Sequence, residues 1–112
     1  MSTAIGREES FYPTLLAINR RAFARAEYEV AYHALAAALH VACDDADAER
    51  ISDVRRIALR QGAWIDTHRP EHRLSSTSAK ARGRNSMFSM LERQAEAAAQ
   101  IDLLARPRGK RP

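Results

Sequence analysis

Histidine, cysteine and carboxylate side chains occur close together between residues 29 and 43, where they could bind a metal ion. His33 and His40 are seven residues apart and so share one face of a helix, with Glu29 one turn before them and Cys43 three residues after. Their spacing is neither His-Glu-x-x-His nor the Glu-x-x-His of di-iron bundles, and the chain has one cysteine. We therefore expect both histidines to border an apolar helix stripe, and we predict no metal and no other cofactor.

A second pair of histidines, His68 and His72, lies among charged residues around Pro70. Neighbouring arginines favour the neutral form of an imidazole, which could then act as a general base. No nucleophile of defined spacing accompanies the pair, because the serine-rich run 75–78 lacks the elbow or the lysine of known serine enzymes. We therefore expect a solvated loop here, with no catalytic residue and no enzyme activity.

Positive charge is concentrated in one internal stretch and at the C-terminal end. The chain carries 18 Lys and Arg against 14 Asp and Glu, a formal net charge of +4. Residues 67–91 hold five of these cations and one acidic residue, and residues 106–112 hold four and none, whereas the rest of the chain is slightly acidic. Together with nearby serines, such cations could bind phosphate groups. The expected contacts for an anion or a nucleic acid are Arg69, Arg73, Lys80, Arg82 and Arg84.

Large apolar residues follow the internal basic stretch directly. On a helix they occupy more than one face, so a single core cannot take all of them. Two of these apolar residues are methionines, and methionine adapts to varied contacts at interfaces. The predicted partner interface therefore consists of Met87, Phe88, Met90 and Leu91. The alternative role for these residues is to cap the helical core of the chain itself.

The elements that carry these residues are predicted to be helices. The segment 27–43 is rich in alanine and contains no glycine or proline. Its small and large apolar residues recur at helical spacing and form one stripe: Tyr28, Ala31, Leu35, Ala38 and Leu39. Because alanine alternates with larger side chains, a second helix can approach this stripe closely. Tight helix–helix packing is therefore the main structural prediction.

Another helix is predicted before this segment, starting near Ser10. Pro13 is tolerated in its first turn, and Ile18 belongs to its inward stripe. Nothing at 24–27 is a strong helix breaker, so one long helix over 13–43 stays open as an alternative.

Two more helices are predicted in the second half of the chain. One starts after the aspartates of 44–47, which can cap a helix N-terminus, and it ends before Pro70. Trp64 is its expected core anchor near the end. The other runs over about 86–105, after a polar connection over 67–85.

The chain of 112 residues has the size of one domain. We predict an all-α fold, a compact four-helix bundle over residues 1–105, followed by a basic disordered tail over 106–112. One cysteine forms no intramolecular disulfide, and the first residues lack the apolar core of a signal peptide, so the expected location is the cytoplasm. The most apolar stretch, 30–43, is too short to span a bilayer.

The segment 12–45 resembles a tetratricopeptide repeat, a helix–turn–helix unit of about 34 residues. Its alanine-containing stripe matches, in order, the Tyr, Ala, large, Ala and Leu positions of the second helix of the repeat. Ile18 and Ala22 fall at the Leu and Tyr positions of the first helix. Ala26 stands where the repeat has a turn glycine, Cys43 stands where proline closes the unit, and no second copy follows. The resemblance implies an antiparallel helical hairpin that binds proteins and does not catalyse a reaction.

Together these observations predict a small protein–protein interaction module. Its partner is another protein, a second copy of the chain included, and no membrane is involved. The alternative is an accessory protein that binds nucleic-acid phosphates through the basic segment 69–84 and the C-terminal tail. Salt separates the two functions, because phosphate contacts lose affinity steeply with added salt, whereas an apolar interface changes little.

Overall fold

The computed structural model describes residues 10–105, and the side chains of residues 10–101. This range contains helices and no strand, so the predicted all-α class is confirmed for it. The five helices of the described range are α2 (Tyr12–Ala24), α3 (Tyr28–Asp44), α4 (Ala48–His68), α5 (Ser76–Ala81) and α6 (Met87–Ala105). The predicted basic tail over 106–112 lies outside the described residues. None of these helices is both long and apolar enough to cross a membrane.

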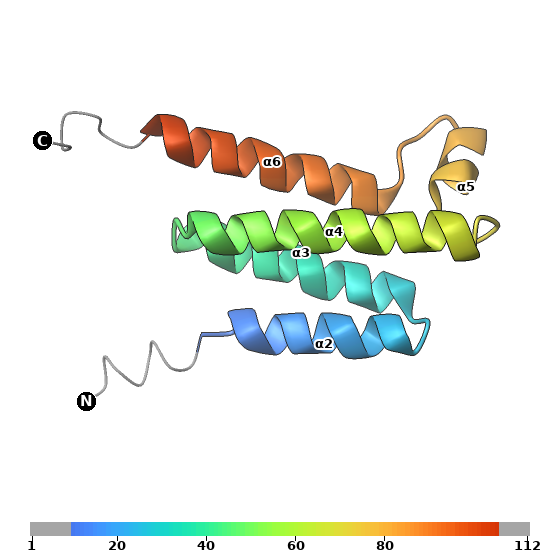
Figure 1. Cartoon of the computed structure of the whole chain (residues 1–112), viewed down its shortest axis with the longest axis horizontal. Coiled ribbons are helices and arrows are strands. Elements are labelled where there is room, and N and C mark those ends of the chain that lie inside the picture. The colour runs from blue at the N-terminus through green and yellow to red at the C-terminus, as the bar shows by residue number, and fades with distance from the viewer. Residues whose placement is uncertain (1–9, 106–112) are drawn as a thin grey trace, which may run out of the picture.

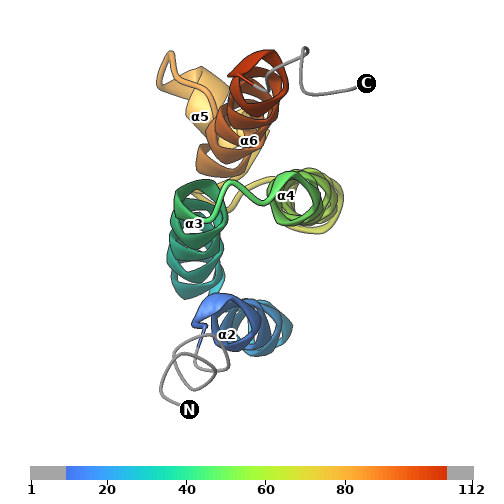
Figure 2. The same ribbon diagram turned by 90° about the vertical axis from the view of Figure 1, so that its left-hand side faces the viewer.

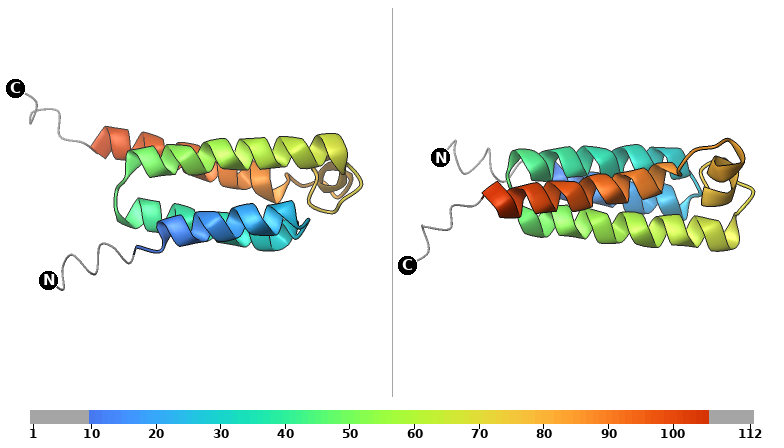
Figure 3. Two further views of the ribbon diagram at one scale, coloured as in Figure 1. Left: turned by 60° about the horizontal axis from the view of Figure 1, so that its bottom comes forward. Right: turned by 90° about the horizontal axis from the view of Figure 1, so that it is seen from above.

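The four longer helices lie side by side, and each runs antiparallel to the one before it (Figure 1). Seen along their axes, α3 and α4 occupy the middle, with α2 on one side and α6 on the other (Figure 2). α3 consequently contacts α2, α4 and α6. The short α5 lies beyond the C-terminal end of α4, where it leads the chain back into α6 (Figure 3).

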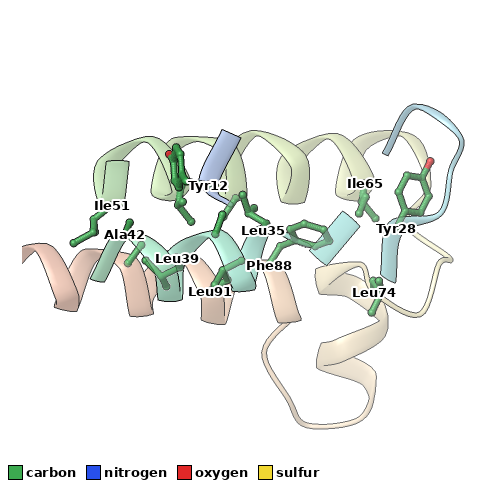
Figure 4. Packing of buried hydrophobic residues seen from close by; sticks show 14 residues of the cluster. Tyr12, Tyr28, Leu35, Leu39, Ala42, Ile51, Ile65, Leu74, Phe88 and Leu91 are labelled. Atoms are coloured by element: carbon green, nitrogen blue, oxygen red, sulfur yellow. The ribbon is translucent and has the colours of Figure 1, made fainter. Parts of the chain in front are cut away.

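The core of the molecule follows α3. All five residues of the predicted apolar stripe are buried, and Ala31, Leu35 and Ala38 have no exposed surface. The stripe is therefore the buried face of α3, as the sequence predicted. Larger side chains from α4 and α6 complete this core, and Figure 4 shows four of them: Ile51, Ile65, Phe88 and Leu91.

α6 approaches α4 closely at Gly62. A Cβ atom at this position would lie 3.1 Å from the Cβ atom of Phe88, which has no exposed surface. Glycine inside a helix costs up to about 1 kcal/mol relative to alanine. Here it leaves room for the largest buried side chain of α6.

A polar residue occupies the inner face of α2. Asn19 has no exposed surface, whereas Ile18 is 42% exposed, so the predicted inward orientation of Ile18 is wrong. Asn19 Nδ2 donates to the carbonyl oxygen of Ala31 (2.8 Å) and to Gln61 Oε1 (3.0 Å). Gln61 Nε2 donates back to Asn19 Oδ1 at 2.8 Å. This amide pair links α2 to both α3 and α4 inside the core.

The N-terminal half contains two helices, and the alternative of one helix over 13–43 is wrong. α2 ends in a Schellman motif, in which the N–H of Glu27 donates to the carbonyl oxygen of Ala22 at 2.8 Å. Ala26 inside this motif has a φ of 63°, in the left-handed region. α3 ends in the same manner at Ala46, with a φ of 52°. Both turns thus place alanine where glycine would be unstrained.

Ala26→Gly is expected to raise the free energy of unfolding by about 0.5–1 kcal/mol. An L-residue in the left-handed conformation costs roughly 1–2 kcal/mol, and the larger chain entropy of glycine offsets part of the gain. Ala97→Gly, the same substitution at an exposed position inside α6, is expected to lower stability by about 1 kcal/mol. Urea denaturation measures both changes. Equal effects of the two substitutions would contradict a strained turn at Ala26.

Tyr12 joins the start of α2 to α4. Its side chain is 5% exposed, and its hydroxyl donates to the carbonyl oxygen of Arg50 at 3.2 Å. The guanidinium carbon of Arg50 lies 4.4 Å from the ring centroid. Burial and, to a smaller extent, the nearby Asp53 carboxylate raise the pKa of Tyr12 above its ordinary value. The folded protein therefore holds this proton more tightly than the unfolded chain does.

The free energy of unfolding is expected to fall as the pH rises past the unfolded tyrosine pKa of about 10. Above that pH the unfolded state loses the tyrosine proton, whereas the folded state still holds it. The stabilisation from Tyr12 is therefore complete below the unfolded pKa, and it is lost as the pH rises to the raised pKa of the folded state. Tyr12→Phe should reduce this alkaline loss, as urea unfolding at a series of pH values would show. A phenylalanine variant with the full wild-type loss would contradict the assignment.

Candidate functional site

The polar connection before α6 contains a helix, α5, whose N-terminus is capped. Ser75 Oγ accepts from the N–H of Ser78 (3.0 Å) and donates to the carbonyl oxygen of Pro70 (2.5 Å). Asp66 of α4 accepts from the N–H of Ser76 at 2.7 Å. Ser75 has no exposed surface, so the predicted solvated loop is wrong at this position. Its hydroxyl group already forms two hydrogen bonds within the protein.

A sharp turn after α5 brings the start of α6 next to it. Gly83 has a φ of 70°, and the N–H of Arg84 donates to the carbonyl oxygen of Ala79 at 2.8 Å. Ser86 then caps α6, because its Oγ accepts from the N–H of Ser89 at 3.0 Å. As a result, the basic stretch and the apolar residues after it surround a common space.

This space is a pocket of about 490 Å³, which we call the α5–α6 pocket. Leu74 and Ala79 are buried beneath it, and Met87 is half-buried. Among the described side chains, arginine is the only charged residue type that lines it. The lining residues are Arg73, Leu74, Ala79, Arg82, Arg84, Asn85, Ser86, Met87 and Met90.

The α5–α6 pocket contains three of the five predicted anion contacts: Arg73, Arg82 and Arg84. The other two, Arg69 and Lys80, do not line it. Lys80 is exposed on α5. Arg69 is engaged elsewhere, because its Nε lies 3.1 Å from a carboxylate oxygen of an exposed glutamate, two residues further along the chain.

Two of the three arginines of the pocket carry a positive charge that no acidic side chain of residues 10–101 neutralises. Arg73 forms an ion pair with Glu29 of α3. Arg82 donates to the carbonyl oxygen of Arg73 at 3.1 Å, a contact that leaves its charge uncompensated. Among the described side chains, no ion pair includes Arg82 or Arg84. An anion entering the pocket would therefore meet two uncompensated guanidinium groups.

The predicted partner interface divides between the core and the pocket. Phe88 has no exposed surface and Leu91 is 1% exposed, so both belong to the core of the chain itself. Met87 and Met90 line the α5–α6 pocket, and Met90 is 51% exposed. The available part of the predicted interface thus lies directly beside the predicted anion contacts.

The residues considered for metal binding do not gather into a site. His33, His40 and Cys43 are exposed on α3, and Glu29 pairs with Arg73. Over the part of the chain that the structure describes, no three His, Cys, Asp or Glu side chains are grouped to hold a metal ion.

The second pair of histidines belongs to an aromatic cluster. His68 stacks on Trp64 with ring centroids 4.4 Å apart, and His72 packs edge-on against Tyr28 at 5.0 Å. Nδ1 of His72 accepts from the N–H of Leu74 at 3.1 Å, which places its ring proton on Nε2. Trp64 is 38% exposed, so its predicted role as a buried core anchor is wrong.

Comparison of the chain with models of protein families, with curated proteins and with solved structures gave no match. The functional argument therefore depends on the chemistry of the α5–α6 pocket. Its uncompensated arginines and apolar lining suit a ligand that carries negative charge next to an apolar group.

Proposed function

We propose that the protein is an interaction module that binds an acidic segment of another protein in the α5–α6 pocket. In this function Arg82 and Arg84 bind carboxylates, and Met87 and Met90 contact an apolar side chain of the same segment. The observation that carries the proposal is the meeting of cationic and apolar side chains in one pocket without an acidic residue.

The lining of the pocket favours a peptide over a nucleic-acid strand. Proteins that bind single strands combine cations with aromatic side chains on which the bases stack. Within residues 10–101, no aromatic side chain lines the α5–α6 pocket, and two methionines do. The alternative function, an accessory protein that binds phosphates through 69–84 and the C-terminal tail, uses the arginines and leaves the methionines without a role.

We further propose the finer architecture of a compact four-helix bundle in which α2 and α3 form a tetratricopeptide-like hairpin. The antiparallel packing of α2 against α3 supports it (Figure 1). So does the left-handed Ala26, which stands where the repeat has its turn glycine. A single hairpin lacks the concave groove of a long array, so we assign partner binding to the pocket. The free thiol of Cys43 supports a cytoplasmic location.

Selection of displayed peptides on the purified protein tests the proposed function. Selected peptides should be enriched in Asp and Glu next to a large apolar residue. Their affinity should fall at least about tenfold for Arg84→Ala, which removes a charge-assisted contact, and about fivefold for Met90→Ala. Fluorescence anisotropy with a labelled synthetic peptide measures these changes.

Lys80→Ala is the matched control, because Lys80 belongs to the same basic stretch and does not line the pocket. The Lys80→Ala variant should bind the peptides with the affinity of the wild type. The proposal fails if the protein binds only oligonucleotides. In that case binding would be lost in Arg82→Ala and Arg84→Ala and unchanged in Met90→Ala. That result would favour the nucleic-acid function.

A further inference from the structure

A second pocket, of about 290 Å³, lies between α2 and α4, and we call it the α2–α4 pocket. It shares no lining residue with the α5–α6 pocket, so what it binds is independent of the proposed function. Three of its residues come from each helix: Arg20, Phe23 and Ala24 of α2, and Arg60, Gln61 and Trp64 of α4.

One part of the α2–α4 pocket is aromatic. The rings of Phe23 and Trp64 lie 5.5 Å apart, at 74° to one another. Each ring has a further aromatic neighbour, because His68 stacks on Trp64 and Tyr28 lies 5.0 Å from Phe23. Trp64 nevertheless remains 38% exposed. A fixed and partly exposed indole is a surface on which a planar ring can stack.

The charged part of the pocket consists of two arginines from different helices. Arg20 and Arg60 are both exposed, and no acidic residue lines the pocket with them. In residues 10–101, none of the ion pairs involves either arginine. Two uncompensated guanidinium groups suit a doubly charged anion, and phosphate is the biological group that offers this charge with oxygen acceptors.

Gln61 supplies a hydrogen-bond donor whose orientation is fixed. Asn19 Nδ2 donates to the carbonyl oxygen of Ala31, which can only accept, so Asn19 Oδ1 must be the atom that faces Gln61 Nε2. Gln61 Nε2 carries two hydrogens, and Asn19 takes one. No other acceptor for Nε2 occurs among the described side chains and backbone. The second hydrogen has no partner among these groups, and Gln61 is one of the residues that line the pocket.

We propose that the α2–α4 pocket binds a single nucleotide. The base lies against Trp64 and Phe23 and accepts a hydrogen bond from Gln61, and the phosphate binds between Arg20 and Arg60. A nucleotide joins the three features that the pocket complements, namely a planar ring, a ring acceptor and a phosphate. The volume lies just below the range of about 300–1,000 Å³ for small-molecule sites, which favours one nucleotide over a longer strand.

The fluorescence of the protein reports on this pocket directly, because Trp64 is the one tryptophan of the chain. Titration of the purified protein with AMP, CMP, GMP and UMP should give saturable quenching for at least one of them. Inorganic phosphate and the matching nucleoside should each bind at least about tenfold more weakly, because each offers only part of the contacts.

Arg20→Ala and Arg60→Ala should each weaken nucleotide binding about tenfold. Arg21→Ala is the matched control, since Arg21 is the neighbouring exposed arginine of α2 and does not line the pocket. Its affinity should equal that of the wild type. Calorimetry on Trp64→Phe should show weakened binding, and circular dichroism should show an unchanged helix content in all four variants.

The proposal is overturned if phosphate or the nucleoside alone quenches as strongly as the nucleotide, because the pocket would then recognise only a charge or only a ring. It is also overturned if Arg21→Ala weakens binding as much as Arg20→Ala does, which would indicate a diffuse charge effect. Affinity for single-stranded oligonucleotides that rises with their length, with no binding of mononucleotides, would replace the nucleotide by a nucleic acid and contradict the proposal as well.

Discussion

Close packing against the alanines of α3 is the constraint on which the rest of the structure depends. α3 lies between α2, α4 and α6, and Ala31, Ala38 and Ala42 on it have no exposed surface. The chain has only seven aromatic residues, so its helices gain stability from close approach more than from bulky side chains. Alanine permits that approach, and the leucines between the alanines fill the space that remains. The positions of the neighbouring helices follow from this face.

The two pockets are consequences of that arrangement. α2 and α4 meet on one side of α3, and the buried amide pair of Asn19 and Gln61 sets how they face each other. A satisfied polar contact inside an apolar core selects one alignment of the helices, because other alignments would leave buried amide groups unpaired. On the other side of α4, at the same end of the molecule, the capped α5 folds the basic stretch over the start of α6. One pocket therefore depends on a long-range amide contact, and the other depends on a local chain reversal.

The fold class and much of the helix pattern could be predicted from the sequence, because they depend on local signals. The spacing of apolar residues identified the buried face of α3. An aspartate was expected at the start of the next helix, and Asp47 Oδ1 accepts from the N–H of Arg50 at 3.1 Å. Pro70 marks the end of α4, which stops at His68. In each case the residues that decide the structure are neighbours along the chain.

The features that sequence reasoning missed depend on distant residues or on backbone strain. Ala26 ends α2 in a left-handed conformation, although alanine is the strongest helix former, so the turn carries no local signal. Asn19 occupies the core in place of Ile18 because it forms hydrogen bonds with Gln61. Gln61 lies 42 residues away in the chain, so no local pattern indicates this pair.

The candidate sites show the same division between local and distant information. The arginines and methionines of the α5–α6 pocket were recognised as two separate groups, and only the reversal after α5 joins them. The α2–α4 pocket was not foreseen, because its two arginines lie on helices whose proximity the amide pair determines. Tertiary contacts of this kind are not encoded in periodicity.

A comparison of Ala38→Leu with Ala97→Leu tests the central constraint most directly. Ala38 has no exposed surface on α3, whereas Ala97 is exposed on α6, and both are in helices. The account predicts that Ala38→Leu lowers the free energy of unfolding in urea by about 1–3 kcal/mol, and that Ala97→Leu changes it by less than about 0.5 kcal/mol. An Ala38→Leu protein as stable as the wild type would contradict the account.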